Sequence, residues 1–505
     1  MENRCMMHTS LRLLLLSTTG CLALAGCGGS RPPPPAGIAG IRSTPAIPRG
    51  RTVSSASLFA IGGSSDVFHG VLGLLNNGSD ALQLRSPGPF VFAQRVPAGA
   101  PYAVTIDQQP PARTCVVLDG SGTAAANVST IRIVCQPASM TVLHDFAATP
   151  ADALSPSGPL AQGPQGRLYG IASSGGANGV GGIYAIDLQG RSSMLYSFQA
   201  AGEGVGPGYR LAFGSGGSLY GVSPGVAVAG DLGAVFRLAP DGTYSVLHSF
   251  LGFTGGQDGA TPSSGLVRTA DGDFYGMTRS GGANNTGTLF RIAPGGAFST
   301  VYSFPPTGGG GLREPSGQLF LSADGGIYGT AARGSKSGSP GGIFRFDPGT
   351  GQVRTVATLQ VLAATPSSGV VETAPGVFYG IARSRATPGQ NLLFQVLVPS
   401  AGGSAAVTQA AALPPSSKSS LGTGALLQAS DGRLYGLLPY ADGGNGALYV
   451  FDPSNQQLRV LYGFSADPTT VGTVPMGGLL LGSDGRFYGA TSSGGPSAGS
   501  VFVFG

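Results

Sequence analysis

Hydrophobic residues occur in short runs along most of this 505-residue chain, and turns rich in Gly, Pro, Asp and Asn separate the runs. This pattern predicts β-strands, because strands are short and an amphipathic helix needs a longer stretch with a period of 3.6. Outside the first thirty residues no stretch keeps a helical period. The chain is therefore predicted to be all-β.

A Tyr-Gly pair recurs seven times and defines a repeat. A glycine lies three residues before every one of these tyrosines, and an apolar run with a central aromatic residue follows each of them. A regular period of 51–56 residues is typical of repeat architectures. The tyrosines are Tyr169, Tyr220, Tyr275, Tyr328, Tyr379, Tyr435 and Tyr488.

Each repeat contains four strand-like runs, which we call A to D. In the third copy they span 264–270, 273–279, 287–293 and 298–304, with a tight Asp-Gly turn between A and B and a Pro-Gly-Gly turn between C and D. Four antiparallel strands in about fifty residues describe a propeller blade, so seven copies predict a seven-bladed β-propeller. The glycine after each tyrosine is expected to let neighbouring blades approach closely.

The two ends of the repeat region predict how the ring closes. The chain stops at run C of the seventh copy, whereas 140–146 (MTVLHDF) matches a D run and precedes the first copy. We therefore expect 140–146 to pair with 500–504 and complete the last blade. A ring closed in this way has no open sheet edge.

The first 26 residues have the features of an export signal, with Arg4 and Arg12 before a short apolar core. The core ends in Leu-Ala-Gly-Cys, which resembles a bacterial lipobox and implies lipidation of Cys27. In bacteria with two membranes, Gly28 in the next position favours the outer membrane. Residues 27–56 are rich in Pro and Gly and are expected to form an extended tether.

Residues 57–137 alternate apolar and polar positions, with hairpin-type turns at Asn-Asn-Gly and Asp-Gly-Ser-Gly, and predict a small β-sandwich. The stretch resembles an Ig-like domain of exported bacterial proteins, which implies a spacer or adhesion module. Cys115 and Cys135 are the two cysteines left beyond Cys27, and we expect them to form a disulfide in an oxidising compartment. The propeller then spans 138–505.

The repeat is similar to the GloVer tandem repeat of exported bacterial proteins. Its pattern, with variable positions as dashes, is DG-LYG-TS-GG---G-LFRI-P-G--S-LYSF. The resemblance runs from Met140 to Gly505 and is weakest in the fifth and sixth copies, where Leu359 and Leu413 replace the phenylalanine of run D. It implies no catalytic residue.

Composition and motifs indicate no cofactor and no metal site. The formal charge of +5 is spread over the chain and does not predict a nucleic-acid surface. The repeated tyrosines are expected to pack in the core, and the Asp-Gly aspartates to form turns. His144 and His248 occupy equivalent D runs of different blades. No catalytic triad motif, phosphate loop or zinc-protease motif occurs.

One face of the predicted propeller carries the long B–C and D–A loops, and function is expected there. Six cations fall on these loops in the fourth and fifth blades and at the entry to the sixth, with Glu314 among them. They would attract an anionic partner such as an acidic glycan or a lipid head group; the alternative is a solvated rim with a chance charge bias. The cations are Arg313, Arg333, Lys336, Arg383, Arg385 and Lys418.

The interpretation favoured by the sequence is a lipid-anchored protein of the bacterial cell envelope, periplasmic or surface-exposed, whose propeller binds a macromolecule or glycan. An envelope lyase or hydrolase and a scaffold without a discrete ligand are the alternatives. Enzymatic propellers of the lyase or cyclase kind use His and Glu near the axis, and this chain has few of both.

Overall fold

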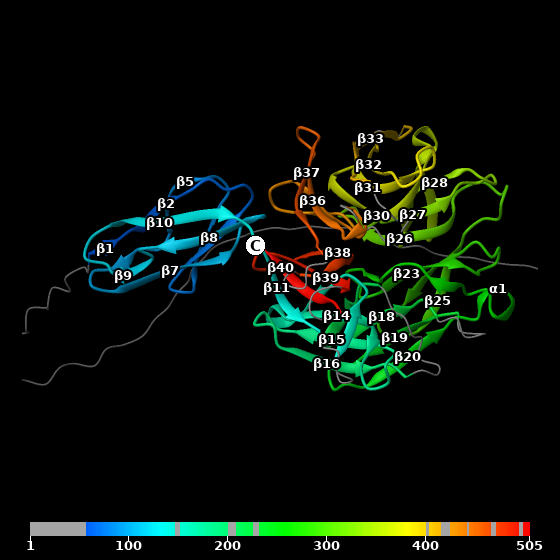
Figure 1. The fold of residues 1–505 in the computed structure, drawn as a ribbon, viewed down its shortest axis with the longest axis horizontal. Coiled ribbons are helices and arrows are strands. Elements are labelled where there is room, and N and C mark those ends of the chain that lie inside the picture. The colour runs from blue at the N-terminus through cyan, green and yellow to red at the C-terminus, as the bar shows by residue number, and fades with distance from the viewer. Residues whose placement is uncertain are drawn as a thin grey trace, which may run out of the picture. The chain divides into compact units, whose positions relative to one another are not determined.

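The structure is a computed structural model, and it describes residues 57–146, 152–199, 209–225, 232–399, 403–415, 425–441, 444–465, 471–493 and 498–505 (Figure 1). The predicted signal, Cys27, the tether and Lys418 lie outside these residues. Within the described part, no helix is both long enough and apolar enough to cross a membrane.

The first ten strands form a small β-sandwich. Strands β5, β2, β10 and β8 make one sheet, β4, β3, β7 and β9 make a second, and β1 pairs with β6. Buried Ile61 and Ile131 of the first sheet and Leu72 of the second belong to one core. The strands are β1 Leu58–Phe59, β2 Ile61–Ser65, β3 Leu72–Asn76, β4 Asp80–Leu84, β5 Gly88–Val91, β6 Val96–Pro97, β7 Pro101–Gln108, β8 Arg113–Leu118, β9 Ser121–Thr123 and β10 Val128–Pro137.

One of the two predicted hairpins of the sandwich is confirmed and the other is wrong. Asn77 and Gly78 join the paired strands β3 and β4 with positive φ angles of 51° and 70°. Asp119 begins a crossover instead, because β8 pairs with β10 while β9 pairs with β7 of the other sheet. The predicted disulfide is present: Cys115 and Cys135 lie opposite each other on β8 and β10.

Seven further sheets, each of four strand positions, form the predicted seven-bladed propeller. In blades 1 and 3 the first strand is split in two. Blades 1 to 3 contain β12 Ala153–Pro156, β13 Ala161–Gln162, β14 Leu168–Gly175, β15 Gly182–Ile186, β16 Ser192–Ser197; β17 Ala212–Phe213, β18 Leu219–Ser223, β19 Ala234–Leu238, β20 Tyr244–Ser249; and β21 Ala260–Pro262, β22 Val267–Arg268, β23 Phe274–Ser280, β24 Thr288–Ile292, β25 Phe298–Ser303.

The other four blades have the same order of strands. They contain β26 Arg313–Leu321, β27 Ile327–Arg333, β28 Pro340–Asp347, β29 Gln352–Thr358; β30 Ala364–Ala374, β31 Val377–Ser384, β32 Asn391–Leu397, β33 Ala406–Ala412; β34 Leu427–Gln428, β35 Leu434–Leu438, β36 Ala447–Asp452, β37 Gln457–Gly463; and β38 Thr473–Leu481, β39 Phe487–Ser493, β40 Ser500–Phe504 with β11 Met140–Asp145. Short helical turns are η1 Pro164–Gly166, η2 Ser215–Gly217, α1 Gly252–Gly255 and η3 Leu359–Leu362.

The ring closes as predicted. Strand β11 pairs antiparallel with β40, with Met140 opposite Phe504 and Thr141 opposite Val503. Strands from the two ends of the propeller region therefore share the last blade, and β11 protects the edge of β40 that would otherwise be open.

Glycine and proline lock several seams between blades. Where a Cβ of Gly287 in blade 3 would stand, the Cδ of Pro315 in blade 4 lies 2.5 Å away. The residue before that proline, Glu314, has a φ of 55° and donates its N–H to the carbonyl of Thr286. Ser155, Thr261 and Val474 repeat this geometry at three other seams. A positive φ is costly for Thr and Val, so the seam hydrogen bonds must offset a local strain.

The glycine after each repeated tyrosine has a different role from the predicted one. A Cβ on Gly276 would lie 2.3 Å from the ring tip of Phe290, which is its partner on the neighbouring strand of the same blade. The other six copies place an aromatic ring over the equivalent glycine in the same way. The glycine therefore makes room for an aromatic residue within a blade, not for the next blade.

The repeated tyrosines and aspartates are structural, as predicted. Tyr435 is 1% exposed and its hydroxyl donates to Asp431 at 2.8 Å; Tyr488 makes the same bond to Asp484. The second carboxylate oxygen of Asp431 accepts the N–H of Arg433, which closes the A–B turn.

Candidate functional site

The loops that join strand B to C and strand D to the next A lie at one end of the ring. In blade 4, Arg313 at the start of β26 is the register partner of Arg333 at the end of β27. The segment that enters β26 and the loop that leaves β27 therefore share one end, which we call the mouth face. The A–B and C–D turns lie at the other end, the turn face.

A cavity of about 950 Å³ lies at the mouth face, and all seven blades contribute to its wall. The first strands of several consecutive blades contact one another, as β26 and β30 do, and contribute to this wall. Four blades have a serine at the same position of the repeat, and all four serines line the cavity. They are Ser157, Ser263, Ser316 and Ser367. The volume is in the range of a small-molecule site.

Four arginines line one side of this cavity, all from blades 3 to 5: Arg279, Arg333, Arg383 and Arg385, the arginine arc. Among the residues that the structure describes, Glu314 is the only acid in the lining, beside four arginines. The described parts of blades 1, 2, 6 and 7 contribute no charged residue to the lining. The electrostatic potential of the cavity is therefore positive on one side.

Two members of the arc are held by contacts that leave other donors free for a ligand. The Nε of Arg333 lies 2.7 Å from Glu314 Oε1, and Arg333 remains 51% exposed. The Nη1 of Arg385 donates to the carbonyl of Gly338 in the B–C loop of blade 4. A guanidinium has five N–H donors, so each of these two arginines keeps several for an anion.

The other predicted rim cations differ in role. Arg313 is 6% exposed and donates to the carbonyls of Gly334 at 2.9 Å and Lys336 at 3.3 Å, so the prediction that it faces a partner is wrong. It supports the loop that follows Arg333. Lys336 is exposed but is not in the cavity lining, and Lys418 lies outside the described residues.

Sequence reasoning missed Arg279 and Tyr209. Arg279 follows the repeated tyrosine of its blade by four residues, as Arg383 does, so the Tyr-Gly alignment contains the signal that would have found it. Tyr209 is the one aromatic residue in the lining as the described ranges show it. It lies in the blade 2 segment whose first strand, β17, has only two residues.

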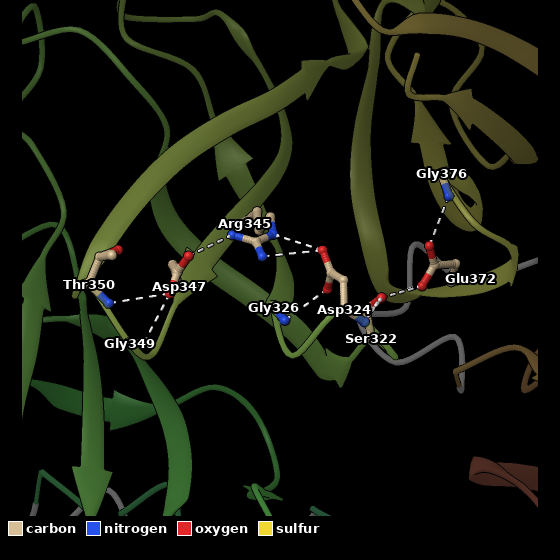
Figure 2. A network of polar contacts seen from close by, with 9 residues as sticks. All are labelled: Ser322, Asp324, Gly326, Arg345, Asp347, Gly349, Thr350, Glu372 and Gly376. Atoms are coloured by element: carbon tan, nitrogen blue, oxygen red, sulfur yellow. Dashed lines mark hydrogen bonds and ion pairs between the residues drawn. The ribbon is translucent and has the colours of Figure 1, made fainter. Parts of the chain in front are cut away.

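Cations on the turn face are neutralised by acids. Figure 2 shows Arg345 between Asp324 of the A–B turn and Asp347 of the C–D turn, at 3.2 and 3.3 Å. The hydrogen bond from Arg345 and the N–H groups of Gly349 and Thr350 lower the pKa of Asp347. This network fastens turns, whereas the described cavity lining has four arginines and one acid, Glu314.

The cavity lining offers little for catalysis or metal binding. As far as the structure describes it, the lining contains no histidine or cysteine and a single carboxylate, which is paired with Arg333. Throughout the described ranges, no three His, Cys, Asp or Glu side chains gather as a metal site would require. What the arrangement can do is hold an anion by hydrogen bonds and charge.

The comparison with protein families gives one match. The family described as Gloeobacter/Verrucomicrobia repeat matches twice, at residues 114–314 and 314–504. A search of curated proteins gave no match.

Solved structures with similar folds have low sequence identity. The extracellular domain of a hybrid two-component system from B. thetaiotaomicron is 12% identical with a TM-score of 0.46, and the match covers 71% of this chain and 39% of that one. An oligogalacturonate lyase in complex with manganese is 11% identical with a TM-score of 0.41, covering 73% and 96%. TolB from Acinetobacter baumannii is 13% identical with a TM-score of 0.34, covering 57% and 61%.

Proposed function

This chain belongs to the Gloeobacter/Verrucomicrobia repeat family, and from that premise we propose that its propeller is a binding module of the bacterial cell envelope that takes an anionic glycan at the mouth face. The observation that carries this proposal is the arginine arc beside the cavity. Guanidinium groups on a concave surface attract anions and bind carboxylate or phosphate groups with paired N–H donors.

The predicted tether supports the same function. A lipid on Cys27 and the Pro-rich segment 27–56 would hold the propeller near the membrane, where envelope glycans occur. A module that captures such a glycan needs neither a catalytic group nor a metal.

The test compares the binding of an acidic and a neutral polysaccharide to the full chain and to a variant with Arg333, Lys336, Arg383 and Arg385 changed to Ser. We expect the acidic polymer alone to bind, with an affinity that falls as salt is added and falls at least tenfold in the variant.

A matched control removes four exposed arginines remote from the cavity, Arg85, Arg95, Arg354 and Arg459, with the same change in net charge. The control should bind like the wild type. Equal loss in both variants would show that net charge alone attracts the polymer, and binding that ignores salt would also reject the proposal.

A further inference from the structure

Blade 2 departs from the other blades at two adjacent positions that face the axis of the ring. The residue eleven positions before the repeated tyrosine is Gly or Ser in six copies, but Tyr209 in blade 2. The next residue is Pro, Gly, Gln or Ala in those copies, but Arg210 in blade 2. The six small or neutral pairs are Gly158-Pro159, Ser264-Gly265, Gly317-Gln318, Ser368-Gly369, Gly424-Ala425 and Gly477-Gly478.

Small residues are required where neighbouring first strands meet at the axis. A Cβ on Gly317 would lie 2.6 Å from the backbone N of Gly369, and a Cβ on Gly477 would lie 2.2 Å from the N of Pro159. Blade 2 is the exception, because Tyr209 packs against the hydrophobic cluster shared by blades 2 and 3 and also lines the cavity.

Tyr209 lies in the cavity wall beside the arginine arc. It is partly exposed, burial raises the pKa of its phenol, and the charge of Arg279 acts in the opposite direction, which places that guanidinium near the ring. A tyrosine ring offers an apolar face and a polar tip, a combination that suits one face of a sugar.

Arg210 occupies the next axial position. Its backbone lies 3.0 Å from the place where a Cβ of Gly265 would stand, on the first strand of blade 3. The residue is exposed by area, yet the surrounding protein lowers the pKa of its guanidinium by desolvation. Arg210 is not among the residues that line the cavity, so the contacts with a ligand are assigned to Tyr209 and Arg279.

We propose that the cavity receives the end of an acidic polysaccharide chain, with the terminal sugar acid packed on Tyr209 and its carboxylate bound by Arg279. This inference rests on the proposed function and names its ligand. The seven first strands enclose the cavity, so a chain enters it by an end, while the rest of the arginine arc meets the following acidic sugars. The neutral wall, with its serines, faces the sugar hydroxyls.

An anionic lipid head group would satisfy the arginines but offers no sugar ring to Tyr209. The probes are therefore tetramannuronate, the same tetramer with its carboxyl groups reduced to alcohols, and vesicles of phosphatidylglycerol. We expect the acidic tetramer to bind and the reduced one not to bind. Binding to vesicles in preference to the tetramer would overturn the proposal.

Two variants of the full chain test the residues. Tyr209→Leu and Arg279→Gln should each weaken binding of tetramannuronate at least tenfold, whereas Tyr209→Phe, which keeps the ring, should bind almost as the wild type does. If both variants bind the tetramer normally while the variant with Arg333, Lys336, Arg383 and Arg385 changed to Ser fails to bind the polymer, the inference about the cavity is wrong and the proposed function stands. If the wild type binds neither the tetramer nor the polymer, both proposals are wrong.

The absence of tryptophan from the chain allows a direct reporter. Tyr209→Trp places a single indole in the cavity, and its fluorescence should shift in wavelength or intensity as tetramannuronate is added. Tyr302→Trp, on the outer strand β25, is the matched control and should not respond. An unresponsive Trp at position 209 in a protein that still binds the tetramer would place the ligand elsewhere.

Discussion

At the scale of single residues, the repeat shows which requirements a sequence reveals and which it hides. A glycine follows the repeated tyrosine in all seven copies, which indicates a position that tolerates no side chain. The sequence does not show which neighbour excludes a side chain there. We expected the next blade to do so, but the neighbour is an aromatic ring on the adjacent strand of the same blade, such as Phe290 over Gly276. The identity of that contact depends on register, which only the folded sheet fixes.

The first prediction concerns that contact. Gly276→Ala should lower the free energy of unfolding by about 1–3 kcal/mol, because the added methyl group collides with the ring of Phe290 in a packed core. Urea unfolding measures it. Gly295→Ala is the control, since a Cβ at Gly295 has no atom within 4 Å. Equal stability of the two variants would contradict the explanation.

The second prediction concerns two blades that have tyrosine where five have phenylalanine. The hydroxyls of Tyr184 and Tyr449 are buried and have no hydrogen-bond partner in the described structure. Since a buried unsatisfied polar group costs about 1–3 kcal/mol, Tyr184→Phe and Tyr449→Phe should raise the unfolding temperature. Tyr435→Phe should lower it, because that hydroxyl donates to Asp431. Destabilisation by all three would contradict the assignment.

The candidate site was predictable only in part for the same reason. Arg333, Arg383 and Arg385 were found because blade loops can be located from the repeat alone. Arg313 also lies at the mouth face, but its side chain is buried and donates hydrogen bonds to two carbonyls. No local sequence pattern distinguishes it from the other arginines. Tyr209 was missed because its role depends on where it lies relative to the axis of the ring, and the sequence alone does not show that place.

At the scale of elements, the strand order and the closure of the ring followed from the periodic pattern, because each blade repeats the same alternation. The first strands are less regular than predicted: register shifts interrupt β26, β30 and β38, and blades 1 and 3 split this strand. These irregularities coincide with the serine and glycine positions that form the cavity wall, as bulges near binding sites often do.

The third prediction tests the closure. Deleting 140–146 removes β11 and exposes the edge of β40. We expect a lower unfolding temperature and concentration-dependent aggregation, because an unpaired strand edge templates association. Thermal unfolding followed by light scattering measures both. An unchanged unfolding temperature would show that β11 does not close the ring.

The fourth prediction uses the network of the turn face in Figure 2. Burial opposes ionisation of Asp324, but the N–H of Gly326 and the charge of Arg345 outweigh it and lower its pKa; Arg345 does the same for Asp347. A carboxyl whose pKa is lower in the folded state stabilises the fold above its unfolded pKa of about 3.9 and loses that effect as pH falls.

Arg345→Met should therefore be less stable than the wild type near neutral pH, and the difference should narrow as the pH falls below about 4. Urea unfolding over a pH series measures it. Arg354→Met, on the adjacent strand β29 and without an acidic partner in the described structure, is the control and should change little. If the difference in stability between Arg345→Met and the wild type did not depend on pH, the carboxylates would not be its cause.

At the scale of the whole molecule, the sequence predicts a lipid anchor, a tether, a spacer and a propeller in that order. The fifth prediction is that Cys27→Ser abolishes labelling with radioactive palmitate and moves the protein from the membrane fraction to the soluble fraction. Continued labelling of the variant would show that the lipid is attached elsewhere.

The central claim is that the cavity at the mouth face binds an acidic glycan, and a crystal structure of the full chain with tetramannuronate tests it most directly. The account predicts density for the terminal sugar beside Tyr209, with its carboxylate within hydrogen-bond distance of Arg279. Density on the turn face, or an empty cavity in crystals grown with saturating tetramer, would contradict it.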